Sequence, residues 1–337
     1  MCNNAEIETV TPTRLVYTTT ALAALLGAQQ APTIRVPVRI VTVPTLVFSA
    51  GNQLISGMQK ADFRVFDNDR LQTTLLDTTI APVSVVVAVQ ANQDVRQYVP
   101  FIARAGSVIE TLLVGDTGEA AVIAYNCDVS VVKSFGEGDV QSSLRKLSPA
   151  GRQARMIDAG VRAIELFKER PVARARVLLF IGQPMDSGSE SHLDSLREQA
   201  ERENVAIYAL TLPVFGKAFV SDTFSLQGVS PGERGGFRAG VDLRSLIAVL
   251  GRSGAVEKGA DPFSALTAST GGTQIHFRRQ RELEGAIAAM GVQLRSSYLL
   301  SYYPGSTEAG YHTIRVEVDV PGAKAWSRPG YWLGATE

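Results

Sequence analysis

The 337-residue sequence contains few of the residues from which disulfide frameworks and metal centres are built. It has 2 cysteines, Cys2 and Cys127, and 3 histidines, His192, His276 and His312. The cysteines give no metal-binding spacing, and the histidines lie far apart in the sequence. Removal of an N-terminal leader would leave one cysteine, so we expect no intrachain disulfide and interpret Cys127 as a small buried strand residue.

The sequence also lacks an excess of charge of one sign. Lys and Arg together number 33, and Asp and Glu together number 33, so the formal net charge is zero. Such a chain has no overall positive field to neutralise a phosphate backbone, which argues against nucleic acid as a partner. Hydrophobic residues make up 45% of the chain, which is enough for a sizeable core, and the length suits two domains.

Signatures of catalysis are missing as well. The segment GDTGEA at 115–120 is not followed by the Lys and Ser/Thr of a phosphate loop, and no serine lies in a nucleophile elbow. The histidines have no evident Ser or Asp partners, and His276 is best interpreted as a core or edge residue of a strand. We therefore expect a protein that is not an enzyme and has no cofactor. A hydrolase site in the irregular segment 214–260 is the least favoured alternative, because that segment offers no pair of nucleophile and base.

The N-terminal segment resembles a secretory signal. Arg14 precedes a short apolar stretch, Leu15 to Leu26, and small residues follow it. The stretch is too short and too rich in threonine to span a bilayer stably. Residues 1–13 contain two glutamates and no lysine or arginine, which suggests that the natural start lies further downstream; a disordered leader before a short helix is the alternative. We expect residues 1–32 to be a leader and the protein to be secreted or periplasmic.

Strands and helices alternate between residues 81 and 296. The expected strands are continuous apolar runs, as burial on both faces requires; they are SVVVAV (84–89), AAVIAYN (120–126), ARVLLFIG (175–182), AIYALTL (206–212) and the shorter TQIHF (273–277). Helices are expected at 95–114, 139–147, 156–170, 192–204, 242–253, 261–270 and 281–295. This alternation predicts an α/β fold with a doubly wound, mostly parallel sheet. The strand at 129–135 follows a tight turn and predicts one antiparallel edge strand.

Both ends of the chain have the pattern of β-structure. The segment 33–80 is rich in Val and Ile and contains an Asp-Asn-Asp turn at 67–69. The segment 297–337 contains three expected strands, at 297–303, 312–320 and 323–333. Neither segment has enough strands for a stable domain of its own. We therefore expect the two to pair into one small β-sandwich, into which the α/β domain, 81–296, is inserted.

The order of these strands and helices resembles that of a von Willebrand factor A-type domain. The runs SVVVAV, AAVIAYN, RVLLFIG and AIYALTL carry this likeness. The flanking segments DFRVFDNDRLQ, LLSYYP and SRPGYW resemble the A-domain-related proteins that are abundant in acidobacteria. The resemblance covers nearly all of the chain after about residue 33. It implies a module for protein interaction or cell adhesion.

The resemblance also implies a site at the carboxyl ends of the central strands. In the family, an Asp, two Ser, a Thr and a second Asp hold a divalent cation there, with one position open for a partner's carboxylate. In this sequence Gln90, Asn92 and Asp94 stand in the places of the first Asp and the two Ser. Ala154 stands where the Thr is expected, and Gln183 where the second Asp is expected.

These replacements predict a site without a metal ion. Both carboxylates that would offset the charge of the cation have become neutral amides, and Arg152 and Arg155 add positive charge nearby. Asp94 is the one acid left in the motif, and a single carboxylate binds Mg²⁺ weakly. Asp186 is a candidate to assist it, which makes weak Mg²⁺-dependent adhesion the alternative, although the segment DSGSES is more simply interpreted as a helix start.

The amides at this edge suggest two roles. They can hold a protein, a peptide or a carbohydrate directly by hydrogen bonds, since ligands bind at this edge of open α/β sheets. Alternatively, they satisfy the backbone groups of their own loops. The candidate ligand-binding residues are Gln90, Asn92, Gln93, Asp94, Ala154 and Gln183.

Overall fold

The computed structural model describes residues 40–51, 53–77, 82–171, 174–212, 261–277, 280–306 and 308–334. The expected leader and the irregular segment 214–260, with its expected helix at 242–253, lie outside these residues. The described residues form one six-stranded sheet with its helices and two four-stranded sheets.

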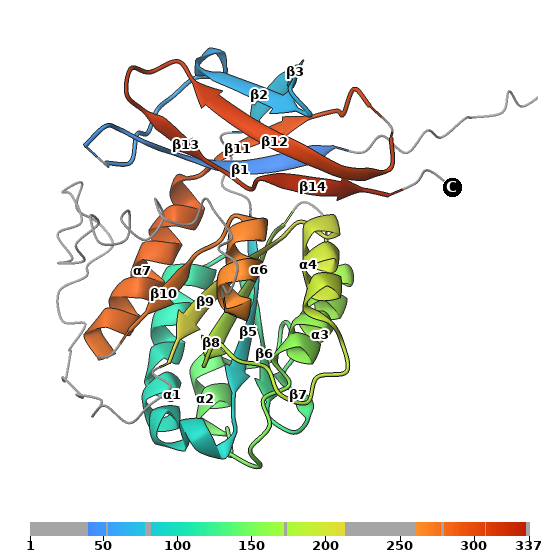
Figure 1. Cartoon of the computed structure of the whole chain (residues 1–337). Coiled ribbons are helices and arrows are strands. Elements are labelled where there is room, and N and C mark those ends of the chain that lie inside the picture. Colours follow the sequence, from blue (N-terminus) through green and yellow to red (C-terminus); the bar gives the residue numbers. More distant parts are fainter. Residues whose placement is uncertain are drawn as a thin grey trace, which may run out of the picture. The chain divides into compact units, whose positions relative to one another are not determined.

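The six-stranded sheet is the centre of the α/β domain. Its strands are β5 (Val83–Gln90), β6 (Glu119–Tyr125), β7 (Val129–Lys133), β8 (Ala175–Gly182), β9 (Val205–Thr211) and β10 (Gln274–His276), in the order β10-β9-β8-β5-β6-β7 (Figure 1). Neighbouring strands are parallel except β6 and β7, which are antiparallel. The expected mostly parallel sheet with one antiparallel edge strand is therefore confirmed.

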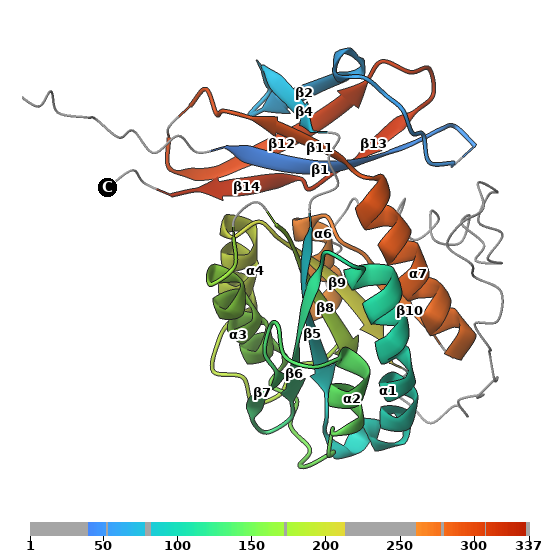
Figure 2. The same ribbon diagram turned by 180° about the vertical axis from the view of Figure 1, so that it is seen from behind.

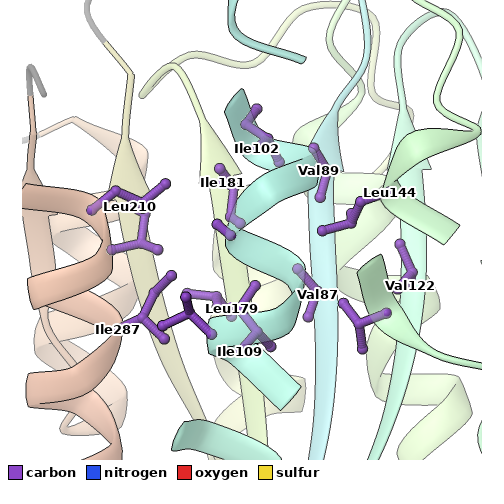
Figure 3. Close-up of a cluster of buried hydrophobic side chains, with 14 of the residues drawn as sticks. Val87, Val89, Ile102, Ile109, Val122, Leu144, Leu179, Ile181, Leu210 and Ile287 are labelled. Carbon is purple, nitrogen blue, oxygen red and sulfur yellow. The ribbon is translucent and has the colours of Figure 1, made fainter. Parts of the chain in front are cut away.

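Helices cover both faces of this sheet (Figure 1). They are α1 (Val99–Val108), α2 (Val140–Arg145), α3 (Met156–Lys168), α4 (Leu193–Arg202), α6 (Pro262–Thr270) and α7 (Gln280–Ser296). Helices α1, α2 and α7 pack on one face, and α3, α4 and α6 pack on the other. Val87 of β5 points into the first layer, together with Leu179 and Ile287 (Figure 3), and its neighbour Val86 points into the second. Because successive side chains point to opposite faces, a strand covered on both must be apolar throughout.

The two four-stranded sheets join both ends of the chain. Their strands are β1 (Val41–Phe48), β2 (Phe63–Asp67), β3 (Arg70–Gln72), β4 (Thr74–Asp77), β11 (Tyr298–Tyr302), β12 (Gly310–Val318), β13 (Lys324–Trp326) and β14 (Gly330–Leu333). The orders are β13-β1-β11-β4 and β14-β12-β2-β3. Each sheet contains strands from both ends of the chain, which are blue and red in Figure 2. Val43, Val65, Leu300 and Tyr302 belong to one shared core. The α/β domain is thus inserted into a β-sandwich, as expected.

Three expectations need correction. The single strand expected at 323–333 is two strands, β13 and β14, which lie in different sheets. The chain crosses between the sheets at 327–329, where Pro329 has no amide hydrogen to donate to a ladder. The expected helix 95–114 begins as the 3-10 segment η2 (Gln93–Tyr98), continues as α1 and ends as the π-helical turn η3 (Ile109–Val114). Cys127 is exposed in the turn between β6 and β7, because that turn and not a strand contains it.

Candidate functional site

The candidate site lies where three neighbouring strands end. Gln90 is the last residue of β5, and Gln183 follows the last residue of β8 directly. The two strands are paired in parallel, with Val89 opposite Ile181, so the two glutamines lie next to each other at the same edge. The structure thus brings together the two glutamines that the sequence placed at one edge, because parallel strands of similar length end together.

Three of the expected site residues form a buried network of amides. Gln90, Asn92 and Gln183 have exposed fractions of 0%, 1% and 4%. Gln90 Nε2 donates to Asn92 Oδ1 at 3.0 Å and to Gln183 Oε1 at 3.5 Å. The backbone N–H of Gln183 donates to Gln90 Oε1 at 2.6 Å. These amides bind one another and their own loops, which is the second of the two roles suggested by the sequence.

The loop before α3 is held against the loop after β5. Asn92 Nδ2 donates to the carbonyl of Arg152 at 3.0 Å, and Gln93 Nε2 donates to the carbonyl of Pro149 at 3.0 Å. Backbone bonds add to these contacts, since Gln93 N–H donates to the carbonyl of Gly151 at 3.0 Å. Two loops that are far apart in the sequence are therefore fixed to each other.

Ala154 connects the same loop to the loop after β8. It forms a bridge with Ser187, in which Ala154 N–H donates to Ser187 O at 3.1 Å and Ser187 N–H donates to Ala154 O at 2.9 Å. Ala154 is buried, with an exposed fraction of 2%. Its contribution at this edge is thus made by its backbone, and it joins the third loop to the other two.

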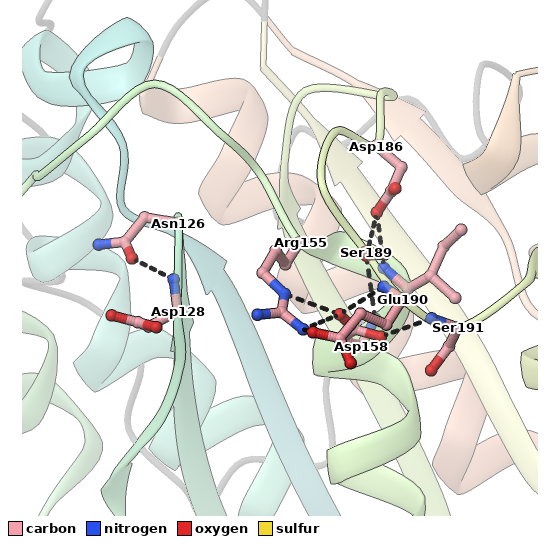
Figure 4. Close-up of polar contacts among 9 residues, drawn as sticks. Asn126, Asp128, Arg155, Asp158, Asp186, Ser189, Glu190 and Ser191 are labelled. Carbon is pink, nitrogen blue, oxygen red and sulfur yellow. Dashed lines mark hydrogen bonds and ion pairs between the residues drawn. The ribbon is translucent and has the colours of Figure 1, made fainter.

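Two carboxylates beside the site join the start of helix α3 to the loop after β8 (Figure 4). Asp186 Oδ1 accepts from Ile157 N–H at 2.9 Å and from Ser189 Oγ at 2.6 Å. Asp158 accepts from Ser191 N–H at 3.0 Å, and Arg155 Nε donates to Asp158 Oδ2 at 2.8 Å. Helix N-termini have unpaired N–H groups, so Asp186 stabilises α3 in place of an ordinary cap. Asp158 lies in the first turn of α3 and binds the loop after β8.

The cation of this group, Arg155, is paired within the group. Burial alone would raise the pKa of Asp158, but hydrogen bonds from Ser191 and Glu190 and the guanidinium of Arg155 outweigh burial and lower the pKa to about 2. Arg155 also pairs with Glu190, at 2.9 Å. Arg155 is therefore neutralised by two carboxylates, whereas Arg152 has no ion-pair partner among the described residues.

The side chains at this edge do not fit a divalent cation. Gln90, Asn92 and Gln183 are neutral and bonded to one another, and Asp186 already caps α3. Asp94 is exposed and accepts from Asn92 Nδ2 at 3.4 Å. Nowhere in the described ranges do three His, Cys, Asp or Glu side chains gather as metal ligands would. A cation here would have to replace these hydrogen bonds with too little negative charge to compensate.

Two residues that support the site were missed by the sequence analysis. Tyr125, the last residue of β6, is fully buried, and its hydroxyl has no hydrogen-bond partner among the described residues. A Cβ atom added at Gly182 would lie 2.3 Å from the Tyr125 hydroxyl and 2.9 Å from Gln90 Oε1. Position 182 therefore requires glycine, so that its backbone can approach the side chains of Tyr125 and Gln90. In the sequence, the sign of this close approach is a glycine at the end of a buried strand.

The exposed residues of the three loops form the outer surface of the site. Gln93, Asp94 and Arg152 are exposed, and Met185 has an exposed fraction of 42%. We call these four residues the rim. Met185 is one of the few large hydrophobic side chains that are exposed in the described part of the chain, and the sequence analysis did not single it out.

Comparisons with known proteins give matches to solved structures. No protein-family model matches the sequence, and no curated protein matches it. A von Willebrand factor type A protein from Catenulispora acidiphila is 11% identical, with 88% of this chain and 74% of that chain covered and a TM-score of 0.45. BatB from Bacteroides thetaiotaomicron is 14% identical, with 64% and 98% covered and a TM-score of 0.39.

A third match is an aerotolerance-related membrane protein from Bacteroides fragilis, which is 16% identical, with 61% of this chain and 96% of that chain covered and a TM-score of 0.38. Likenesses at this level say nothing of ligands or partners. The mostly parallel sheet and its antiparallel edge strand are those that the pattern of the sequence predicted. Fold and site together define a mostly parallel α/β domain with buried amides at the carboxyl edge of its sheet.

Proposed function

We propose that this protein is an exported, non-enzymatic interaction module that binds a protein or peptide through the rim, without a metal ion. The observation that carries the proposal is the attachment of three loops to one another by buried amides and backbone bonds. Loops fixed in this way lose little conformational entropy when a partner binds. The rim is therefore suited to recognition.

The composition of the rim supports a protein or peptide as the partner. Arg and Met are enriched in protein interfaces, and Arg152 and Met185 are the exposed cationic and apolar side chains of the rim. Asp94 adds a negatively charged hydrogen-bond acceptor, and Gln93 adds an amide. A partner that complements this rim has an anionic group beside an apolar one, and Gln90, Asn92 and Gln183 act as its supports rather than as its contacts.

Export is proposed from the signal-like stretch near the N-terminus, with its Arg14 and the apolar run that follows. Among the described residues, no helix is both long and apolar enough to cross a lipid bilayer. The absence of a nucleophile–base pair in the sequence supports a role in binding rather than in catalysis.

Capture of partners from native periplasm or culture medium tests the proposal. The double variant Arg152→Glu, Met185→Ala should lose a partner that the wild-type chain retains, in buffer with EDTA as well as with Mg²⁺. Arg162→Glu is the matched control, because Arg162 is exposed on α3 and pairs with Glu165 there. Capture that survives the double variant, or that disappears in EDTA, would contradict the proposal.

A further inference from the structure

Four polar side chains lie together in the core of the β-sandwich. Asp67 of β2, Tyr302 of β11, His312 of β12 and Tyr331 of β14 have exposed fractions of 4%, 0%, 2% and 4%. We call them the sandwich cluster. Tyr302 belongs to one sheet and the other three to the second sheet, so the cluster connects the two.

The carboxylate of Asp67 is the centre of the cluster. Its Oδ2 accepts from the hydroxyls of Tyr302 at 3.1 Å and Tyr331 at 2.8 Å. Its Oδ1 lies 2.9 Å from His312 Nδ1. Asp67 comes from the N-terminal segment and its three partners come from the C-terminal segment, so these bonds hold the two ends of the chain together.

Both ring nitrogens of His312 face acceptors. Nδ1 faces Asp67 Oδ1, and Nε2 lies 2.9 Å from the carbonyl oxygen of Glu308. A neutral imidazole has one N–H and would leave one of these acceptors opposite a lone pair, whereas the imidazolium donates to both. Both contacts of the ring are therefore hydrogen bonds when His312 is protonated and Asp67 is ionised.

We propose that the sandwich cluster is a pH-sensitive switch of stability, in which protonation of His312 strengthens the pairing of the N- and C-terminal segments. Loss of the proton removes one donor in a buried place and leaves the charge of Asp67 without its cation. An unpaired buried charge is strongly destabilising, so the sandwich weakens as His312 becomes neutral.

The charged and titratable groups around His312 come from several elements. The carbonyl of Glu308, the carboxylate of Asp67 on β2 and the charge of the Glu308 side chain favour the imidazolium. Burial alone would lower the pKa of His312, but these acceptors outweigh burial and raise it. Arg328 is buried, with its guanidinium 5.7 Å from the centroid of the Tyr331 ring. Tyr302 and Tyr331 are neutral at physiological pH, because burial raises the pKa of both hydroxyls.

The direction of the effect follows from the raised pKa of His312. The stabilisation is complete below the ordinary histidine value of about 6.5 and is lost as the pH rises through the pKa in the folded state. The stabilisation that the tyrosines contribute is also lost as the pH rises, but only above the ordinary tyrosine pKa of about 10. The two effects therefore occur in separate ranges of pH.

Titration of the histidine ring protons by NMR tests the proposal on the native chain. The chain has 3 histidines, and the variants His192→Gln and His276→Gln, both at exposed positions, assign the signals. The signal of His312 should titrate with a midpoint above about 6.5. A midpoint at or below that value overturns the proposal, and this readout requires no substitution within the cluster.

Thermal unfolding between pH 5 and pH 9 gives a second test. The melting temperature of the wild-type chain should fall by about 3 °C or more above neutral pH, and His312→Gln should have a lower melting temperature at pH 5 with no such fall. Tyr302→Phe is the control, because it removes one hydrogen bond to Asp67 and keeps the titrating ring. A fall that persists in His312→Gln would overturn the proposal.

Discussion

Gln90 shows how one residue changes the chemistry of this edge. Its amide accepts a hydrogen bond from the backbone of Gln183 and donates to Asn92 and Gln183, so both halves of the side chain are used. A carboxylate at the same buried position could accept but not donate, and without a cation its burial would cost several kcal/mol. The amide thus satisfies without charge a position that a carboxylate would leave charged and uncompensated.

Removal of the Gln90 amide should therefore destabilise the protein. Gln90→Leu leaves the Gln183 N–H and the Asn92 Oδ1 without their partner, and we expect a loss of about 2 kcal/mol in the free energy of unfolding. Gln93→Ala, at an exposed position, should change it by less than about 0.5 kcal/mol. Urea denaturation measures the free energy of unfolding of both variants. Equal losses would mean that the buried amides stabilise the protein no more than an exposed side chain does.

The sequence predicted the location of these amides but not their orientation. Gln90 and Gln183 follow apolar runs that can only be neighbouring buried strands, so their proximity was predictable. Whether the side chains point inward depends on the space around Gly182 and on the ring of Tyr125, which are set by tertiary packing. Met185 was not recognised for a similar reason, because a single apolar residue in a loop has no periodicity to interpret.

At the scale of elements, the start of helix α3 depends on carboxylates from another part of the chain as well as on its own. Asp158 lies in the first turn of α3 and accepts the N–H groups of Glu190 and Ser191. Asp186 accepts the N–H of Ile157 in return. The helix and the loop after β8 therefore stabilise each other.

Asp158→Asn should lower the free energy of unfolding and weaken the dependence of that free energy on pH in the acidic range. The pKa of Asp158 is lowered from 3.8 to about 2, so its contribution is present above about pH 4 and lost as the pH falls towards 2. The side chain is 12% exposed, and the shift corresponds to about 2 kcal/mol at neutral pH. Urea denaturation at pH 7 and pH 3 measures the effect. Asp194→Asn, at an 85% exposed carboxylate, is the control and should show neither change.

The turn between β2 and β3 gives a third prediction. Asn68 and Asp69 have φ angles of 45° and 62°, as a two-residue hairpin turn of type I′ requires. Asp69→Val should destabilise the protein by about 1–2 kcal/mol, because a β-branched residue is strained in this conformation. Asp69→Gly, which has no such strain, serves as the control; an equal loss of stability in thermal unfolding would instead indicate that the Asp69–Arg315 ion pair is responsible.

Elements with a clear pattern of apolar residues were predictable, whereas irregular connections were not. The central strands are uniformly apolar, and the Asp-Asn-Asp turn at 67–69 is a strong hairpin signal. The division of 323–333 into β13 and β14 was missed because both halves have similar residues and differ only in the sheet they join. The π-helical end of α1 likewise depends on packing rather than on local preference.

At the scale of the whole molecule, the two ends of the chain form one core. Strand β1 lies between β11 and β13, and β2 lies between β3 and β12, so neither end can complete a sheet alone. The α/β domain has separate cores on the two faces of its own sheet. The two parts should therefore respond differently to a truncation.

Deletion of residues 324–337 should unfold the sandwich and spare the α/β domain. The deletion removes β13 and β14 together with Tyr331 of the sandwich cluster. In hydrogen exchange, the amides of β2 and β12 should lose protection while those of β5 and β8 keep it. Unchanged protection of β2 would show that the N-terminal segment does not depend on the C-terminal strands.

The central proposal is that an edge filled with buried neutral amides does not hold a divalent cation. Calorimetric titration of the full chain with Mg²⁺ and with Mn²⁺, up to millimolar concentrations, tests it most directly. The account predicts no saturable heat in the wild-type chain and none in Asp94→Asn. Saturable binding that Asp94→Asn abolishes would contradict the account.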